Sequence, residues 1–282
     1  MAVHELPLAP ETVRGWFSAE FPPALSIEPG DSIRFRALNS GWRWERDGGE
    51  HFPRDGGHAL SGPVEVRGVR AGQTLVVRID EVTPRDWGVT FADGEPLFWE
   101  IDDGVARCDH GEVAAAPFLG VIGLPPPEPG HHSTIPPRRF GGNVDCKLLV
   151  AGTTLYLPVG VDGALLLAGD GHAAQGDGEV SGTAIECPLE AAQLTLDVQD
   201  GPELRMPLAR TRDAWIAFGF DEDLDRAADL ALETMLDLME RELDVSRRAA
   251  LALASVAVDL HVTQVVNQAK GVHAVLPDGA IR

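Results

Sequence analysis

The chain has 282 residues, of which 44% are hydrophobic, and its 44 acidic residues outnumber its 23 basic residues to give a formal net charge of −21. This charge repels phosphate backbones and anionic lipid, so nucleic acid and membrane surfaces are excluded as expected partners. The chain has no apolar run near the ~20 residues of a membrane span and no leader-like start, so we expect a soluble, cytoplasmic protein.

Short strands dominate the first three quarters of the chain. Apolar and polar residues alternate in residues 32–38 and 73–82, and this period of two predicts strands with one solvent-facing side. Further strands are predicted where Gly, Pro or Asp bound apolar segments, at residues 64–69, 155–161, 164–168, 194–198 and 214–220. Many short strands indicate a β-sandwich or barrel.

A proline-rich stretch interrupts these strands at residues 125–137 and predicts a long loop, a feature that is often functional in compact domains. Helical spacing of apolar residues appears only after residue 220. Acids at 221–223 mark the start of one helix, and Ser246 is the expected N-cap of a second. The expected fold is therefore mainly β with a C-terminal helical segment, α+β overall.

We expect one unit over residues 1–282, since β-rich architectures often reach this length as a single body. Three subdomains are possible within it: a β-rich N-terminal part at 1–125, a β-rich catalytic part at 126–220, and helices with a closing strand at 221–282. The three cysteines are widely spaced and include no Cys-x-x-Cys pair, so neither a disulfide framework nor a thiolate zinc finger is predicted.

Polar side chains of the kinds that catalyse reactions are concentrated in residues 162–186, where they lie among six glycines directly after an apolar strand. Glycine permits positive φ and close approach to a ligand, so the loop is able to bring its polar groups together. These groups are Asp170, His172, Gln175, Asp177, Glu179 and Glu186. The pattern is typical of a reaction centre.

A second polar signature, Arg-Phe-Gly-Gly-Asn-Val-Asp at 139–145, precedes the strand-like residues 155–159. Together with residues 162–186 it resembles the acetamidase/formamidase family of amide hydrolases. Four more segments resemble that family in order along the chain, at 22–31, 58–64, 258–267 and 270–277. The resemblance implies an amidase acting on a small neutral amide such as formamide or acetamide. It also implies a homo-oligomer, and we expect the strand at 262–266 and the following tail to form the contact.

Amides resist hydrolysis because resonance weakens the carbonyl electrophile and an amine leaves poorly. A divalent metal polarises the carbonyl and lowers the pKa of bound water to roughly 7, and a carboxylate can then shuttle the proton. We therefore expect attack by metal-bound water, with zinc as the expected ion and calcium as the alternative. The expected metal ligands are His58, Asp145, His172, Asp170 and Glu186.

The expected catalytic residues are Glu186, for proton transfer, together with Asp145 and His172. Asn143 and Gln175 are the expected substrate-binding residues, because their amides can orient a carbonyl or a water molecule. Simpler roles remain open for several acids. Asp145 could form an Asx turn after the paired glycines, and Asp170, Asp177 and Glu179 could decorate glycine turns.

Other catalytic plans fit the sequence less well. The chain lacks adjacent serines after glycine, a Gly-x-Ser-x-Gly elbow and the acid ladder of an EF-hand. Cys146 beside Lys147 is a weak nitrilase-like nucleophile and is expected to be a packed core residue. Two alternatives to the amidase stay open: a metal-dependent β-sandwich enzyme of another reaction class, and a non-catalytic, metal-stabilised binding module.

Overall fold

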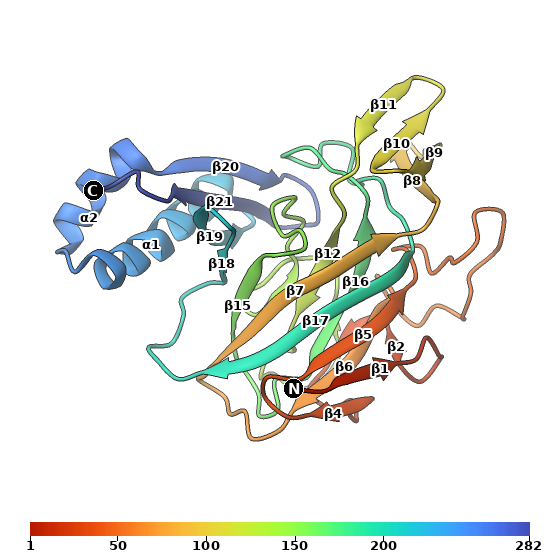
Figure 1. Cartoon of the computed structure of the whole chain (residues 1–282), viewed down its shortest axis with the longest axis horizontal. Coiled ribbons are helices and arrows are strands. Elements are labelled where there is room, and N and C mark those ends of the chain that lie inside the picture. Colours follow the sequence, from red (N-terminus) through yellow and green to blue (C-terminus); the bar gives the residue numbers. More distant parts are fainter.

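Two large β-sheets pack face to face over the main hydrophobic core in the computed structural model, which describes all 282 residues (Figure 1). The larger sheet has nine strands, in the order β1 (Val3–Leu6), β5 (Ser32–Ala37), β17 (Leu189–Gln199), β7 (Thr74–Pro84), β15 (Thr154–Pro158), β18 (Leu208–Arg210), β19 (Ala214–Asp221), β21 (Lys270–Pro277) and β20 (Asp259–Gln264).

The second sheet carries the strands on which the polar signatures lie. Its order is β14 (Gly141–Asn143), β12 (Phe118–Gly123), β16 (Leu166–His172), β6 (Leu60–Val66) and β2 (Val13–Arg14), with β4 (Leu25–Ile27) also paired to β6. A four-stranded sheet projects from this body, in the order β11 (Gly111–Ala114), β10 (Val105–Cys108), β9 (Glu95–Asp102) and β8 (Trp87–Ala92) (Figure 1). A small pair joins β13 (His132–Ser133) to β3 (Trp16–Phe17).

The alternation predicted from the sequence sets the inner face of the larger sheet. Leu75, Val77 and Ile79 of β7 are fully buried, whereas Arg78 between them reaches solvent. Because successive side chains of a strand point to opposite faces, this pattern gives β7 one core face and one wet face.

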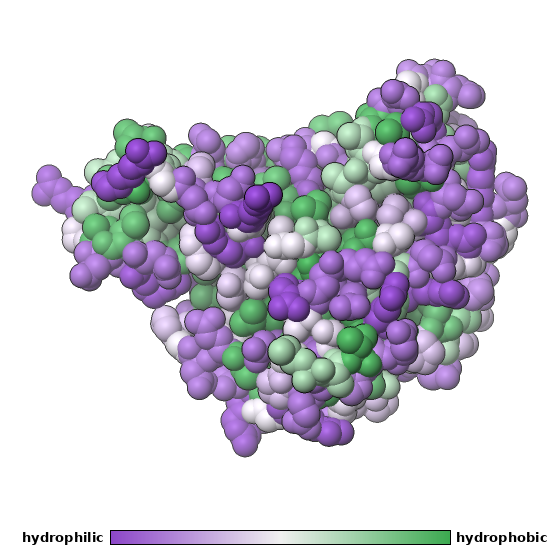
Figure 2. All heavy atoms as spheres, viewed as in Figure 1, coloured by the Kyte–Doolittle hydropathy of each residue, from purple (hydrophilic) through white to green (hydrophobic).

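Hydrophilic residues cover most of the face of the molecule seen in Figure 2, which also shows the molecule hollowed between its two projecting ends.

Two helices, α1 (Leu224–Leu243) and α2 (Arg247–Ala257), cover the end of the larger sheet and form a second core with it. Asp223 caps α1 by accepting from the backbone N–H groups of Asp225 and Arg226, and Ser246 caps α2 as predicted. Gly219 of β19 lets α1 approach closely, since a Cβ there would lie 2.1 Å from the carbonyl oxygen of Ala227. Neither helix is long and apolar enough to cross a membrane.

The prediction of a mainly β fold with a C-terminal helical segment is confirmed. The strand expected at 164–168 instead runs from Leu166 to His172, because pairing with β12 on one side and with the segment around Glu186 on the other continues it into the glycine-rich segment. Asp170 and His172 therefore lie on a central strand and not in a loop. The larger sheet draws strands from all three expected subdomain ranges, and the division at 125 and 220 stays a prediction.

Candidate active site

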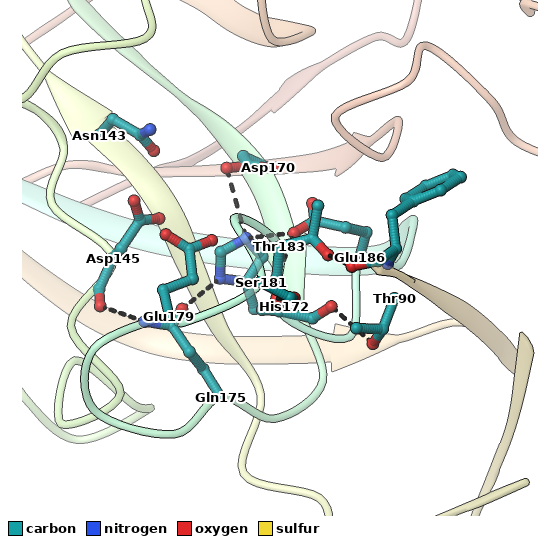
Figure 3. A network of polar contacts seen from close by, with 12 residues as sticks. Thr90, Asn143, Asp145, Asp170, His172, Gln175, Glu179, Ser181, Thr183 and Glu186 are labelled. Atoms are coloured by element: carbon teal, nitrogen blue, oxygen red, sulfur yellow. Dashed lines mark hydrogen bonds and ion pairs between the residues drawn. The ribbon is translucent and has the colours of Figure 1, made fainter. Parts of the chain in front are cut away.

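Five buried polar side chains converge beside β16 (Figure 3). Asp170 and His172 come from β16 itself, and Asp145 lies two residues after β14. Glu179 and Glu186 come from the segment between β16 and β17. We call these residues the acid–histidine cluster; each of the five is at most 5% exposed. Segments that form the two polar signatures of the sequence thus meet at one point.

The backbone at three members of the cluster lies in the left-handed region. Asp145 has φ +48°, Asp170 has φ +58° and Glu179 has φ +45°. Such values are uncommon for residues other than glycine and cost free energy, so they persist where the surrounding structure holds them. Three such residues around one histidine point to a functional constraint at this position.

His172 occupies the centre of the cluster. Its Nε2 lies 3.4 Å from Oδ2 of Asp170 and 3.2 Å from Oε1 of Glu186, although neither oxygen is aligned for a hydrogen bond. On the other side of the ring, Nδ1 lies 3.0 Å from Oε1 of Gln175, and Nε2 of Gln175 donates to the carbonyl oxygen of Asp145 at 2.7 Å. This second bond sets the orientation of the Gln175 amide, so Nδ1–H of His172 donates a hydrogen bond to Oε1 of Gln175.

The cluster contains buried polar atoms that have no hydrogen-bond partner. They are Oδ1 of Asp145, Oδ1 of Asp170, Nε2 of His172 and Oε2 of Glu186. Leaving such atoms unpaired costs free energy, and a bound ion is able to satisfy them. Ligand atoms of Asp145, Asp170 and His172 lie within 4.8 Å of one another, as do those of His172, Glu179 and Glu186. The donor set therefore fits a cation.

The charges of the cluster are strongly coupled. Burial and the nearby charge of Glu179 raise the pKa of Asp145 well above its usual value, and burial raises the pKa of Glu179 to about 7. Burial alone would lower the pKa of His172, but the carboxylates of Glu186 and Asp170 outweigh it and raise that pKa. The cluster holds four buried carboxyl groups and only one imidazole, so the negative charge is not balanced within it. This imbalance also favours a bound cation.

Two residues of the site, Asn267 and Glu179, are not among the catalytic, substrate-binding or metal-binding residues expected from the sequence. Asn267 follows β20, and its Nδ2 donates to Oδ2 of Asp145 at 2.9 Å and to Oε2 of Glu179 at 3.2 Å. Glu179 stands out in the glycine-rich segment, but its spacing alone does not distinguish a site residue from a turn residue. Gly120 of β12 was also missed: a Cβ there would lie 2.7 Å from Oδ2 of Asp170.

Three of the predicted residues lie at the edge of the cluster. His58 binds Thr134 through Nδ1 at 3.0 Å, and its ring nitrogens belong to neither close group of ligand atoms. Burial alone would raise the pKa of Asp170, but the nearby His172, with a smaller contribution from His58, outweighs burial and lowers that pKa. Asn143 donates from Nδ2 to the carbonyl oxygen of Ile135 and leaves its buried Oδ1 free, whereas both ends of the Gln175 amide bind protein groups.

A cleft of about 460 Å³ opens beside the cluster, between residues 174–185 and the projecting four-stranded sheet. Gln175 and Glu179 line its inner side, and Trp99 and Val113 line the side of that sheet. Among the five members of the acid–histidine cluster, only Glu179 lines the cleft. The cleft therefore borders the cluster at Glu179.

A model of a known protein family matches this region. Residues 128–210, which hold all five members of the cluster, match the model of the acetamidase/formamidase family. The chain is 50% identical over 246 aligned residues to the acetamidase of Mycolicibacterium smegmatis, and the match covers 57% of this chain and 60% of that protein. The chain thus spans less than two thirds of the length of that curated relative.

Solved structures resemble the chain over nearly its whole length. A predicted acetamidase/formamidase from Thermoanaerobacter tengcongensis is 27% identical, with a TM-score of 0.88 over 98% of this chain and 96% of that one. An acetamidase from Bacillus halodurans is 29% identical, with a TM-score of 0.86 over 97% of each chain. The resemblance to the acetamidase/formamidase family seen along the sequence is confirmed by these matches, which extend it over nearly the whole chain.

Proposed function

We propose that this protein hydrolyses short aliphatic amides, such as formamide and acetamide, to ammonia and a carboxylate. The observation that carries the proposal is the acid–histidine cluster, whose unpaired buried atoms lie inside the segment matched by the family model. The relatives known as acetamidases and formamidases support the substrate class. A cleft next to the cluster gives such a substrate access.

Asp145, Asp170 and His172 are the residues that we propose to hold a divalent cation. When bound, this cation would polarise the amide carbonyl and lower the pKa of the attacking water. An imidazole in the donor set favours zinc over calcium, because calcium takes oxygen ligands. Glu186, with Oε2 free, is a further candidate ligand, whereas His58 binds Thr134 and lies outside both groups of ligand atoms.

The polar neighbours of the cluster hold its members in place. Gln175 fixes the ring of His172 through Nδ1 and so directs Nε2 toward Asp170 and Glu186. The backbone N–H of Ala184 donates to Oε1 of Glu186 at 2.9 Å and leaves Oε2 as a proton acceptor. We assign proton transfer to Glu186 together with Glu179, and Glu179 is the one that borders the cleft.

Asn143 is the residue that we propose to orient the substrate, because its buried Oδ1 is free to accept from an amide N–H group. Gln175 was expected to share this task, but both ends of its side chain already bind protein groups, so we assign it to positioning His172.

A cytoplasmic location and self-association remain predictions. Residues 262–266 run from β20, at the outer edge of the larger sheet, into the turn that follows it.

Ammonia release from formamide, acetamide and propionamide tests the proposal. We expect release from at least one of these amides, and we expect Glu179→Gln to lower the rate by ~10²-fold or more. A cation-loaded protein that releases no ammonia from any of them would favour another reaction class or a non-catalytic binding module.

A further inference from the structure

A second cluster of ligating side chains lies beside the candidate active site but shares no residue with it. It consists of Asp177, His261 and His273, and one ligand atom from each lies within 4.8 Å of the others. His261 and His273 face each other across β20 and β21, with ring centroids 5.0 Å apart. Nδ1 of His261 lies 3.5 Å from Oδ2 of Asp177.

The backbone fixes the turn that carries Asp177 against β20. The N–H of Gly178 donates to the carbonyl oxygen of Thr263 at 3.0 Å, and the N–H of Val265 donates to the carbonyl oxygen of Gly178 at 3.0 Å. Asp177 is therefore held next to the histidine pair by main-chain bonds that do not depend on its own side chain. The placement of the three residues is built into the sheet.

His273 supplies an independent sign that this cluster takes a ligand. Its side chain is fully buried, and its Nε2 has no hydrogen-bond partner. Its other ring nitrogen, Nδ1, lies 2.8 Å from Oγ1 of Thr263. Histidines that bind metals usually have their second nitrogen engaged in this way, which fixes the ring and leaves the first nitrogen available.

From this geometry we infer that Asp177, His261 and His273 form a binding site for a divalent transition metal, with zinc as its best match. Two imidazoles and one carboxylate are a ligand set that zinc prefers, and bonds of roughly 2.0–2.1 Å require ligand atoms about 3.3 Å apart. His261 and Asp177 already approach this separation, and both side chains are partly exposed and free to adjust. His273 is the fixed ligand.

The ammonium group of Lys147 contacts the Asp177 carboxylate, where the proposed metal would bind. Its Nζ lies 3.0 Å from Oδ2 of Asp177, and its side chain is 38% exposed. A long, flexible lysine side chain at this exposure can turn into solvent and release the carboxylate. The metal and the Lys147 ammonium therefore compete for Asp177. Removal of the ammonium should leave zinc affinity equal to or greater than that of the wild type.

Zinc counting on the full chain tests the inference without relying on amide hydrolysis. Protein freed of metal with a chelator is dialysed against zinc and analysed for bound metal per chain. We expect His261→Ala to bind one zinc fewer than the wild type, and the matched control His110→Ala, at an exposed histidine on the projecting sheet, to bind the wild-type number. His261 is 42% exposed, and a thermal melt checks that its replacement leaves the fold intact.

Two further measurements sharpen the result. Cobalt loaded in place of zinc should give visible absorption typical of four-coordinate geometry, part of which is lost in His261→Ala but not in His110→Ala. Lys147→Met should bind zinc at this site as tightly as the wild type or more tightly. Equal metal counts in His261→Ala and wild type, a wild type that takes up no zinc, or weaker zinc binding by Lys147→Met would overturn the inference.

Discussion

Asn267 donates from Nδ2 to Oδ2 of Asp145 at 2.9 Å, although 122 residues separate the two in the chain. The same amide nitrogen reaches Oε2 of Glu179 at 3.2 Å. One neutral donor therefore bridges two buried carboxylates that would otherwise repel each other. The turn between β20 and β21 closes one side of the acid–histidine cluster in this way.

Asn267→Gly should lower kcat/KM for acetamide by about 10-fold or more, because a hydrogen bond to a buried charged group is worth about 1.5–3 kcal/mol. Glycine keeps the backbone at φ +63° without strain, so the change removes the amide alone. The matched control is Gln268→Gly, at a neighbouring exposed residue with φ +67°. Equal losses in the two variants would mean that the turn backbone, and not the Asn267 amide, supports the site.

Asp145→Ala should abolish ammonia release, with a loss of ~10³-fold or more, and should also remove one bound cation per chain. A cooperative thermal melt should remain, since Asp145 contributes to the site and not to the hydrophobic core. The control is Asp109→Ala, at an exposed residue of the projecting sheet. Retained activity in Asp145→Ala would remove this residue from the site.

Glu179 should make the cation-free protein less stable as pH rises. Its pKa is about 7 in the folded protein and 4.5 in an unperturbed chain, so between these values the folded state holds a proton that the unfolded state has lost. Because stability falls with pH wherever the unfolded state binds fewer protons, the free energy of unfolding should drop by up to about 3 kcal/mol from pH 4.5 to 7.

Urea unfolding of chelated protein at several pH values measures this slope. Glu179→Gln should flatten it, because glutamine does not titrate, whereas Glu11→Gln, at an exposed turn, should leave it unchanged. A slope that survives in Glu179→Gln would show that the buried carboxylate does not titrate in this range.

Cys146→Ala should keep ammonia release within about two-fold of the wild type. Cys146 is fully buried in the main core, and burial raises the pKa of its thiol to about 12, so the thiolate is scarce at neutral pH. The loss of a small core side chain should cost about 1 kcal/mol of stability. Inactivation of Cys146→Ala by more than about 100-fold would revive a thiolate mechanism.

Local features of the chain could be predicted from its sequence. The N-cap at Ser246 and the alternation along β7 follow from residue types and spacing in short segments, whereas the pairing of Asp145 with His172 was expected from the resemblance of their two segments to the family. The extension of β16 through Asp170 could not be predicted, because it depends on pairing with β12 and with the segment around Glu186. A strand flanked on both sides tolerates glycines that would break an isolated one.

Contacts between distant segments account for the rest of the site. Asn267 carries no motif that links it to Asp145, and their contact depends on how the last hairpin packs against the glycine-rich segment. The projecting sheet of β8 to β11, which forms one wall of the cleft, was not predicted either. Its strands β9 and β11 are mostly exposed or half-buried, and they lack the clear apolar alternation of β7.

The most direct test of the amidase proposal is ammonia release from acetamide and formamide by protein that has been stripped of cations and then reconstituted. We expect stripping to lower the rate by at least ~10²-fold, and zinc to restore it in the wild type but not in Asp145→Ala. Full ammonia release by protein that elemental analysis shows to be free of divalent cations would contradict a cation-dependent acid–histidine cluster.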